Sequence, residues 1–296
     1  MNPDRAARGV GAVINRTLAD FLATHPAALD YLELMPEMLW TDYGRGSAPR
    51  YEEMPAARAM VDRLAAQYPL VCHGIGLSIG SAMPLDEQHL AQVARTAERY
   101  GAGRYSEHLG FFRVATGPGH DRHMGLGMPL PCDEAVLDWL IPRVRRAGEM
   151  LGMPLLLENG VRHTPYADED MSEPQFLNRL GAATGCGVLL DLHNLYTDYR
   201  NNGSPPDAYI AELDLALVRE IHVAGGAMLG RAYTDAHAGP CPSTVTALLR
   251  ALVPACPRLE GITFEFHESV APRFGPAALQ NELALLAEIW SSHHVA

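Results

Sequence analysis

Polar residues able to bind metal recur at the ends of short apolar runs along this chain of 296 residues. Six runs share this feature: LVCHGIG (70–76), RYSEHLGF (104–111), PLLLENG (154–160), GVLLDLHN (187–194), REIHVAG (219–225) and GITFEFHE (261–268). Each run reads as a buried strand, and burying an unpaired charge costs several kcal/mol or more. We therefore expect the titratable groups to converge on one site, where bound cations compensate their charge.

The candidate ligands are imidazoles, carboxylates and one amide, without a thiolate. Most end the six runs, and two more follow in the motif TDAH. They are His73, His108, Glu158, Asp191, Asn194, His222, Asp235, His237 and Glu265. Four carboxylates in one cavity would raise one another's pKa values sharply unless cations were bound. One ion uses about four to six ligands, so this set indicates two or three ions. The ligand types favour Fe, Mn or Zn over Cu(I) or an iron–sulfur cluster.

Three further groups lie beside these positions. Glu33 and Glu37 end the run DYLELMPE (30–37), where a salt bridge or a backbone cap is as well supported as a catalytic role. His267 follows Glu265 by two residues, a position from which it can support a ligand.

The elements that must position these groups alternate regularly. With GVGAVIN (9–15) and DYLELMPE (30–37) the strand candidates number eight. Stretches of helical period lie between and after them, at 17–25, 51–68, 84–100, 133–152, 172–185, 206–217, 242–253 and 276–292. Eight strands alternating with eight helices predict a (β/α)8 TIM barrel, an α/β fold, as a single domain over residues 1–296.

An open doubly wound sheet is the rival fold. It would normally carry G-x-G-x-x-G after its first strand, but GVGAVINR has Ile14 at the third glycine position. In a barrel the carboxyl ends of all strands meet on one face, so the candidate ligands would ring a common centre. Three loops that follow strands, at 41–49, 113–125 and 197–206, are candidates for a lid or a peptide-binding rim, or are ordinary surface loops.

Composition excludes several classes of protein. The formal net charge of −12 argues against nucleic-acid binding, which relies on Lys and Arg. No apolar run reaches the roughly 18 residues of a membrane span, and the start MNPDRAARGVGAVINR lacks an apolar signal region. Five cysteines without a C-x-x-C pair predict buried thiols rather than a disulfide framework. A reducing cytoplasm is therefore the expected location.

Long motifs in the chain resemble the multinuclear non-heme iron-dependent oxidases. The matching stretches run from about residue 30 to 268 and include ELMPEM, HGIGLSIGSAMPLDEQHL, SEHLGF, PLPCDEAV, LGMPLLLEN, MSEPQFLNRLGAATGCGVLLDLHNLY, EIHVAGG and TDAH. The blocks HG-x-G-L-S-x-G-S and TGCG-x-LLD are the most specific of them.

The resemblance implies a TIM barrel that holds two or three irons and uses dioxygen. Such enzymes modify ribosomally made peptides, often at cysteine, and many act with a small partner protein that presents the precursor peptide. The nine candidate ligands above match the family's positions, with Glu158 as the bridging carboxylate. We expect Glu158, Asp235 and His237 to be the catalytic members of this set.

The chain also departs from the family's pattern. Residues 193–194 read His-Asn where the family usually has Asn-Asn, and 265–267 read Glu-Phe-His where it usually has Glu-x-Asp. Met38 replaces the usual Asn, and the first strand lacks the usual Arg. We expect His193 and His267 either to add a ligand or to tune one.

From the resemblance we expect a mixed Fe(II)/Fe(III) cluster that oxidises a precursor peptide at Cys or at another residue, such as Asp or Asn. Two other functions stay open. A divalent-metal sugar isomerase or phosphodiesterase of the xylose-isomerase-like barrels also places Glu, Asp and His at strand ends. A non-catalytic, metal-dependent scaffold would bind a peptide without turnover.

Overall fold

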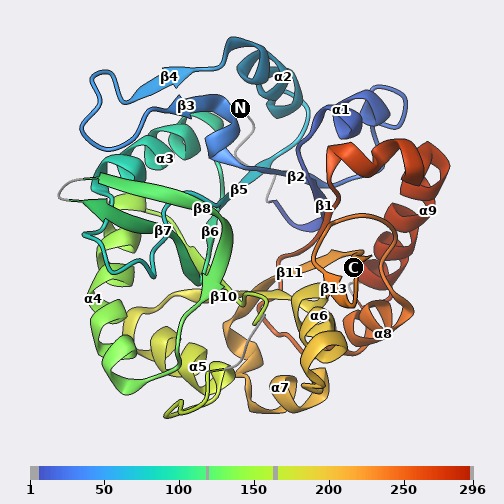
Figure 1. Cartoon of the computed structure of the whole chain (residues 1–296). Helices are drawn as coiled ribbons and strands as arrows, with labels where there is room; N and C mark the ends of the chain where they lie inside the picture. Colours follow the sequence, from blue (N-terminus) through green and yellow to red (C-terminus); the bar gives the residue numbers. More distant parts are fainter. Residues whose placement is uncertain (1–6, 118–119, 163–165, 294–296) are drawn as a thin grey trace.

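The computed structural model describes residues 7–117, 120–162 and 166–293. Eight parallel strands in these ranges close into a barrel in the order β1-β14-β11-β10-β9-β6-β5-β2 (Figure 1). Their bounds are β1 (Gly9–Val13), β2 (Tyr31–Leu34), β5 (Leu70–Gly74), β6 (Tyr105–His108), β9 (Leu155–Glu158), β10 (Gly187–Asp191), β11 (Val218–Ala224) and β14 (Gly261–Glu265). Every strand predicted from an apolar run is confirmed, and so is the TIM barrel.

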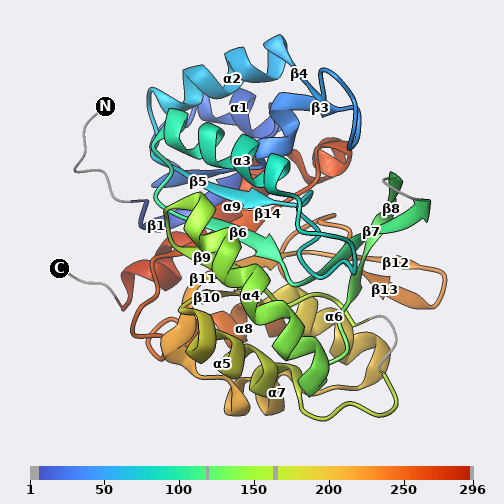
Figure 2. The same cartoon turned by 90° about the vertical axis from the view of Figure 1, so that its left-hand side faces the viewer.

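Helices pack around the outside of this ring (Figures 1 and 2). They are α1 (Arg16–Leu22), α2 (Pro55–Ala65), α3 (Glu87–Tyr100), α4 (Glu134–Leu151), α5 (Glu173–Thr184), α6 (Leu192–Asn202), α7 (Pro206–Glu212), α8 (Ser243–Leu252) and α9 (Ala271–Ser291). Side-chain caps start several of them: Asn15 for α1, Asp86 for α3 and Ser172 for α5. Gly275, with φ +70°, kinks α9.

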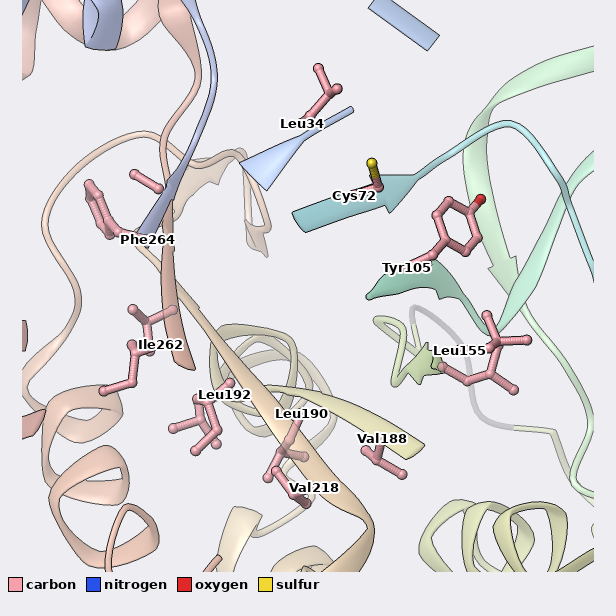
Figure 3. Close-up of a cluster of buried hydrophobic side chains, with 14 of the residues drawn as sticks. Leu34, Cys72, Tyr105, Leu155, Val188, Leu190, Leu192, Val218, Ile262 and Phe264 are labelled. Carbon is pink, nitrogen blue, oxygen red and sulfur yellow. The ribbon is translucent and has the colours of Figure 1, made fainter. Parts of the chain in front are cut away.

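Side chains alternate between the barrel interior and the helix layer, as the pleat of a strand requires. In β11, Ile221 and Val223 join the large apolar cluster between strands and helices, whereas Glu220 and His222 bind groups of other strands across the interior. Figure 3 shows part of the apolar cluster, with Phe264 pointing away from the centre of the ring. The apolar runs are therefore buried toward the helices, and the polar residues between them face inward.

A polar network closes the amino-terminal end of the barrel interior. Glu220 accepts hydrogen bonds from the Tyr31 hydroxyl (2.9 Å), the Thr263 hydroxyl (2.6 Å) and Arg104 Nε (2.7 Å). Gly11 leaves room for this network, because a Cβ there would lie 2.4 Å from the Tyr31 ring. The floor of the barrel is thus filled, and the opposite end carries the candidate ligands.

Three hairpins and one helix differ from the sequence prediction. The range 113–125, predicted as a loop, belongs largely to the hairpin of β7 (Gly110–Gly117) and β8 (His120–Pro129), with residues 118–119 outside the described part. The range 197–206, also predicted as a loop, begins with the last turns of α6.

Residues 51–53 of the predicted helix 51–68 form β4 (Tyr51–Glu53), which pairs with β3 (Trp40–Asp42) around the loop 41–49. A third hairpin joins β12 (Ala227–Leu229) and β13 (Ala232–Thr234).

Short 3-10 helices complete the connections: η1 (Pro36–Leu39), η2 (Leu215–Leu217) and η3 (Glu268–Val270). All five cysteines are free thiols; four are buried and Cys241 is partly exposed. Across the described ranges, every helix is too short or too polar to cross a bilayer.

Candidate metal centre

Glu158 lies between two imidazoles at the carboxyl ends of neighbouring strands. The strand register pairs His108 with Glu158 and His73 with Ser106. Glu158 Oε2 is 2.8 Å from His108 Nδ1 and 3.4 Å from His73 Nε2, and the two histidine Nε2 atoms are 3.2 Å apart. His73 Nδ1 is 2.9 Å from the Ser106 hydroxyl, which fixes the ring orientation. These three candidate ligands present their donor atoms to one small volume.

His222 lies between two carboxylates and next to His73. Its Nε2 atom lies 3.0 Å from Glu33 Oε2, and its Nδ1 atom lies 3.4 Å from Glu265 Oε2. The His73 and His222 ring centroids are 5.1 Å apart. Glu33, whose role the sequence left open, is fully buried inside this cluster. It therefore belongs with the candidate ligands rather than with the surface.

Asp191 ends β10 and also caps α6. One carboxylate oxygen accepts a 2.7 Å hydrogen bond from the Asn194 backbone amide. Asn194 Nδ2 donates to the Asn159 carbonyl at 2.9 Å. The Asn159 side chain donates to the Asp191 carbonyl and accepts a hydrogen bond from the Asp191 backbone amide. Asp191 Oδ2 and Asn194 Oδ1 are buried without a hydrogen-bond partner in the described part of the chain. Such orphaned oxygens are the donors that a hard cation would satisfy.

The loop after β11 completes the ring of donors. His237 Nε2 is 3.0 Å from Asp235 Oδ1 and 3.4 Å from Glu265 Oε2. His237 adopts a left-handed backbone conformation (φ 47°), and its carbonyl accepts a hydrogen bond from the backbone amide of His267. Asp235 Oδ1 also lies 2.6 Å from Nδ1 of the buried His193.

The pKa shifts record how strongly these groups interact. Burial favours the neutral form of His108, but the Glu158 carboxylate outweighs it and raises the pKa of His108 to about 9. Burial likewise opposes protonation of His222 and His237, yet Glu33 and Glu265 raise the pKa of His222 well above its usual range, and Asp235 and Glu265 raise that of His237 to about 10.

The carboxylates divide into two groups. Burial opposes their ionisation, but neighbouring imidazoles hold the pKa values of Glu158, Asp235 and Glu265 below the ordinary value. For Asp191, burial and the nearby Glu158, Asp235 and Glu265 together raise the pKa well above that value. The raised pKa of Asp191 therefore reflects the crowding of carboxylates around it, which a bound cation would relieve.

Three overlapping groups of side chains could each hold a metal ion. They are Glu33 with His73 and His222, His73 with His108 and Glu158, and Glu158 with Asp191 and His222. In each group the donor atoms lie within 4.8 Å of one another. Because His73, Glu158 and His222 each belong to two groups, the arrangement suits adjacent ions that share ligands. Imidazole and carboxylate donors fit iron, manganese or zinc.

Two of the predicted supporting residues lie elsewhere. Glu37 accepts hydrogen bonds from the Gly76 amide (3.0 Å) and lies 2.9 Å from His89 Nε2, so it ties η1 to α3. The side chain of His267 is exposed and contacts Ser269.

Three supporting residues were not foreseen from the sequence. Ser106 could have been found, because it alternates with His108 on the same face of β6. Asn159 directly follows Glu158 in the motif LLLEN, which is a comparable signal. Tyr233 contacts His193 through its hydroxyl (3.1 Å), and no sequence pattern marks it.

A cavity of about 270 Å³ opens onto the cluster. His108, Asn194 and Asp235 line its inner part, and Phe112, Leu126, Gly127, Met128, Pro129, Val161 and Thr234 are among the residues around it. Most of its lining is therefore apolar, with the polar groups gathered at the metal cluster.

Comparisons with known proteins show the family and the fold of this chain. A family model described as "RiPP precursor modification enzyme MbnB/TglH/ChrH" matches residues 9–290. A UPF0276 protein of Anaeromyxobacter sp. (strain Fw109-5) is 32% identical over 254 residues, which cover 86% of this chain and 83% of that protein.

Two solved structures share the fold at low sequence identity. A xylose isomerase domain protein from Planctomyces limnophilus has a TM-score of 0.58 at 13% identity, covering 98% of this chain and 99% of that one. An IOLI protein with a bound zinc atom has a TM-score of 0.60 at 12% identity, covering 97% and 99%.

Proposed function

The chain belongs to the MbnB/TglH/ChrH family of enzymes that modify precursors of ribosomally synthesised and post-translationally modified peptides, and on this premise we propose that it is an iron-dependent oxidase of such a peptide. It would use two or three irons, in Fe(II) and Fe(III) states, with dioxygen as co-substrate. The three overlapping ligand groups carry this proposal, because His73, Glu158 and His222 each belong to two groups, as expected of adjacent ions that share ligands.

The candidate ligands divide by their place in the cluster. Glu158 faces His73, His108 and Asn194, the position expected of a bridging carboxylate. His222, Glu33 and Asp191 lie deeper and are fully buried, so we assign them to holding metal alone. Iron bound in this cluster would supply the redox chemistry with dioxygen, and the protein would supply position and charge.

The partly exposed members of the cluster are the ones a substrate can reach. His108, Asp235 and His237 are each about one quarter exposed, at 26%, 24% and 27% of the side chain. His237 Nε2, faced by Asp235 and Glu265, can hold a proton beside the substrate. We therefore assign catalytic roles to Asp235 and His237, and we assign one to the buried Glu158 as the carboxylate that would bridge the metals. We also propose a cytoplasmic location and a small partner protein that presents the peptide.

The experiment that tests this proposal begins with anaerobic purification and metal analysis. The protein is then given oxygen and short candidate precursor peptides translated from the neighbouring genes, and oxygen uptake and peptide mass are measured. We expect two or three irons per chain and an oxidised peptide. One zinc per chain without iron-dependent oxygen uptake would contradict the proposal.

Matched variants locate the activity in the cluster. His73→Ala and Glu158→Ala should each lose iron and peptide oxidation, since each residue belongs to two ligand groups. His25→Ala is the control, because its ring stacks on Phe21 near the end of α1 and has no part in the cluster. Equal loss in all three variants would point to misfolding instead.

The solved structures with the same fold suggest one alternative enzyme class. A divalent-metal sugar isomerase or phosphodiesterase would show manganese or zinc and turnover without oxygen. The mainly apolar cavity lining disfavours a sugar, whose hydroxyl groups would be buried there without partners. A non-catalytic scaffold would bind the peptide but leave its mass unchanged under oxygen and reductant.

A further inference from the structure

Two hairpins extend beyond the barrel on the same side (Figure 2). One is β7–β8 and the other is β12–β13. Each exposes large apolar side chains: Met124 and Leu126 on the first are 37% and 51% exposed, and Met228 and Leu229 on the second are 54% and 75% exposed. Exposed apolar groups gathered in this way commonly mark a binding surface.

The first hairpin is shaped by a wide bulge. The register runs from Phe111↔Met128 to Arg113↔His123, so the four residues Met124–Gly127 lie opposite Phe112 alone. Gly125 adopts φ +77° inside this bulge. Residues in a bulge leave the regular ladder and re-aim their side chains, and bulges are frequent beside active sites. The exposed Met124 and Leu126 both belong to this segment.

Phe112 connects the bulge to the metal cluster. Its ring centroid is 5.2 Å from that of His108. A Cβ at Gly127 would lie 2.6 Å from the Phe112 ring, so glycine there is what lets the ring lie across the neighbouring strand. Phe112 thereby forms an apolar wall directly beside a candidate iron ligand.

The cavity joins the two hairpins. Leu126, Gly127 and Met128 line it from β8, and Thr234 and Asp235 line it from the end of β13. Its inner end is formed by His108 and Asn194. A ligand that follows this path therefore touches an apolar wall on its way to the cluster.

We propose that the space between the two hairpins binds an extended segment of the precursor peptide, with an apolar residue next to the residue that is modified. This inference rests on the proposed function and names the substrate feature that the site selects. The apolar neighbour would pack on Phe112 and Leu126, and the modified residue would reach His108 and Asp235. Extended residues advance about 3.3 Å each, so flanking residues on either side would reach Met124 and the tip of β12–β13.

An extended chain explains the apolar surface better than a compact ligand does. A small polar substrate would fit within 270 Å³ and would not need the exposed apolar groups of the two hairpins. The bulge also leaves β8 backbone groups outside the regular ladder with β7. Such groups can pair with the main chain of a peptide irrespective of its sequence. Binding would thus combine main-chain pairing with an apolar preference at one position.

The test uses a displayed library of ten-residue peptides with a fixed central Cys and random flanks. Purified protein without added iron or oxygen selects binders, and a fluorescein-labelled binder is titrated by fluorescence anisotropy. We expect selected peptides to carry Leu, Ile, Val, Met or Phe next to Cys. Leu126→Asp and Met228→Asp should each weaken binding by about tenfold or more, the effect of removing one central apolar contact.

Val114→Asp is the matched control, since Val114 is an exposed apolar residue (37%) of the same hairpin that lines a different cavity. The proposal is overturned if no peptide is selected, if the flanks show no apolar preference, or if Val114→Asp weakens binding equally. It is also overturned if Leu126→Asp abolishes a dimer, seen by light scattering, without changing peptide binding. Because the assay needs no turnover, its result is independent of the metal analysis that tests the oxidase.

Discussion

His193 stands where the family resemblance leads us to expect Asn, and its contacts in the structure suggest its role. Its Nδ1 atom lies 2.6 Å from Asp235, and its Nε2 atom lies 3.1 Å from the Tyr233 hydroxyl, which accepts a 2.9 Å hydrogen bond from the Gly226 amide. This chain of contacts lets Tyr233 donate to Nε2 and leaves the Nδ1 proton for Asp235. We therefore propose that His193 orients the candidate ligand Asp235 and does not bind metal itself.

Removing this imidazole should weaken metal binding. We expect His193→Ala to lower the affinity for Fe(II) about 10- to 100-fold, the usual cost of losing a group that orients a ligand. Competition with a chromophoric chelator under anaerobic conditions measures the change. Tyr233→Phe, which keeps the imidazole and loses only the hydroxyl, should have a smaller effect. Unchanged affinity in His193→Ala would show that Asp235 needs no such support.

At the scale of elements, the start of α3 shows how the hairpin β3–β4 is attached to the helix layer. Asp86 caps this helix by accepting from the His89 amide (3.1 Å) and receives two hydrogen bonds from Arg50, at 2.8 and 2.7 Å. Burial opposes ionisation of Asp86, but Arg50 outweighs it and lowers the pKa of Asp86 to about 2. The hairpin β3–β4 is thereby attached to α3.

This pair predicts a pH-dependent contribution to stability. A depressed carboxyl pKa stabilises the fold above the ordinary value near 4, and the contribution is lost as pH falls toward about 2. Asp86→Asn should lower the free energy of unfolding by about 2 kcal/mol at pH 7, the range for a hydrogen-bonded charged group. Urea titrations from pH 7 to pH 3 should show this difference narrowing only below about pH 4. A constant difference across the series would contradict the assignment.

The barrel could be predicted well from the sequence, whereas the hairpin β7–β8 and the turns of α6 could not, for one physical reason. Strands buried under helices need long apolar runs, such as LVCHG in β5, and these are visible without any partner. The hairpin β7–β8 is stabilised instead by pairing with itself, and its Gly and charged residues resemble a loop. The turns of α6 after Asn194 were missed similarly, because polar residues such as Asn201 face away from the core.

The candidate ligands could be predicted wherever a residue's place at the end of a strand is enough to bring it to the site. Asp191, His222 and Glu265 follow from their place at strand ends. Glu33 was undecided, because only the register of β2 within the closed barrel shows that it faces His222. Tyr233 depends on how a loop folds back over α6, which no local pattern specifies.

At the scale of the whole molecule, the two ends of the barrel have opposite requirements. The floor network pairs the Glu220 carboxylate with Arg104, Tyr31 and Thr263, and Arg104 lowers the pKa of Glu220 to about 2 against the effect of burial. The mouth concentrates carboxylates that need a cation. The floor therefore stabilises the fold without metal, while the mouth would gain stability from a bound metal.

Removing Arg104 from the floor network should lower the free energy of unfolding more than most single substitutions do. Arg104→Met would leave Glu220 buried and unpaired, which destabilises proteins by about 3–5 kcal/mol. The double variant Arg104→Met/Glu220→Leu should recover much of that loss, because neither charge then remains. Urea unfolding measures both free energies. A double variant as unstable as the single one would show that packing around Arg104, and not its charge, matters.

The bulged hairpin has a consequence for how such enzymes diversify. Met124–Gly127 lies outside the regular ladder and outside the apolar layer between strands and helices. Substitutions of Met124 and Leu126 would leave both the core and the candidate metal ligands in place, whereas Gly125, with φ +77°, and Gly127, which contacts Phe112, are constrained. Under the binding mode proposed above, a lineage can therefore exchange one peptide sequence for another by drift in two exposed residues. Substrate range is thus the trait that this architecture leaves freest to evolve.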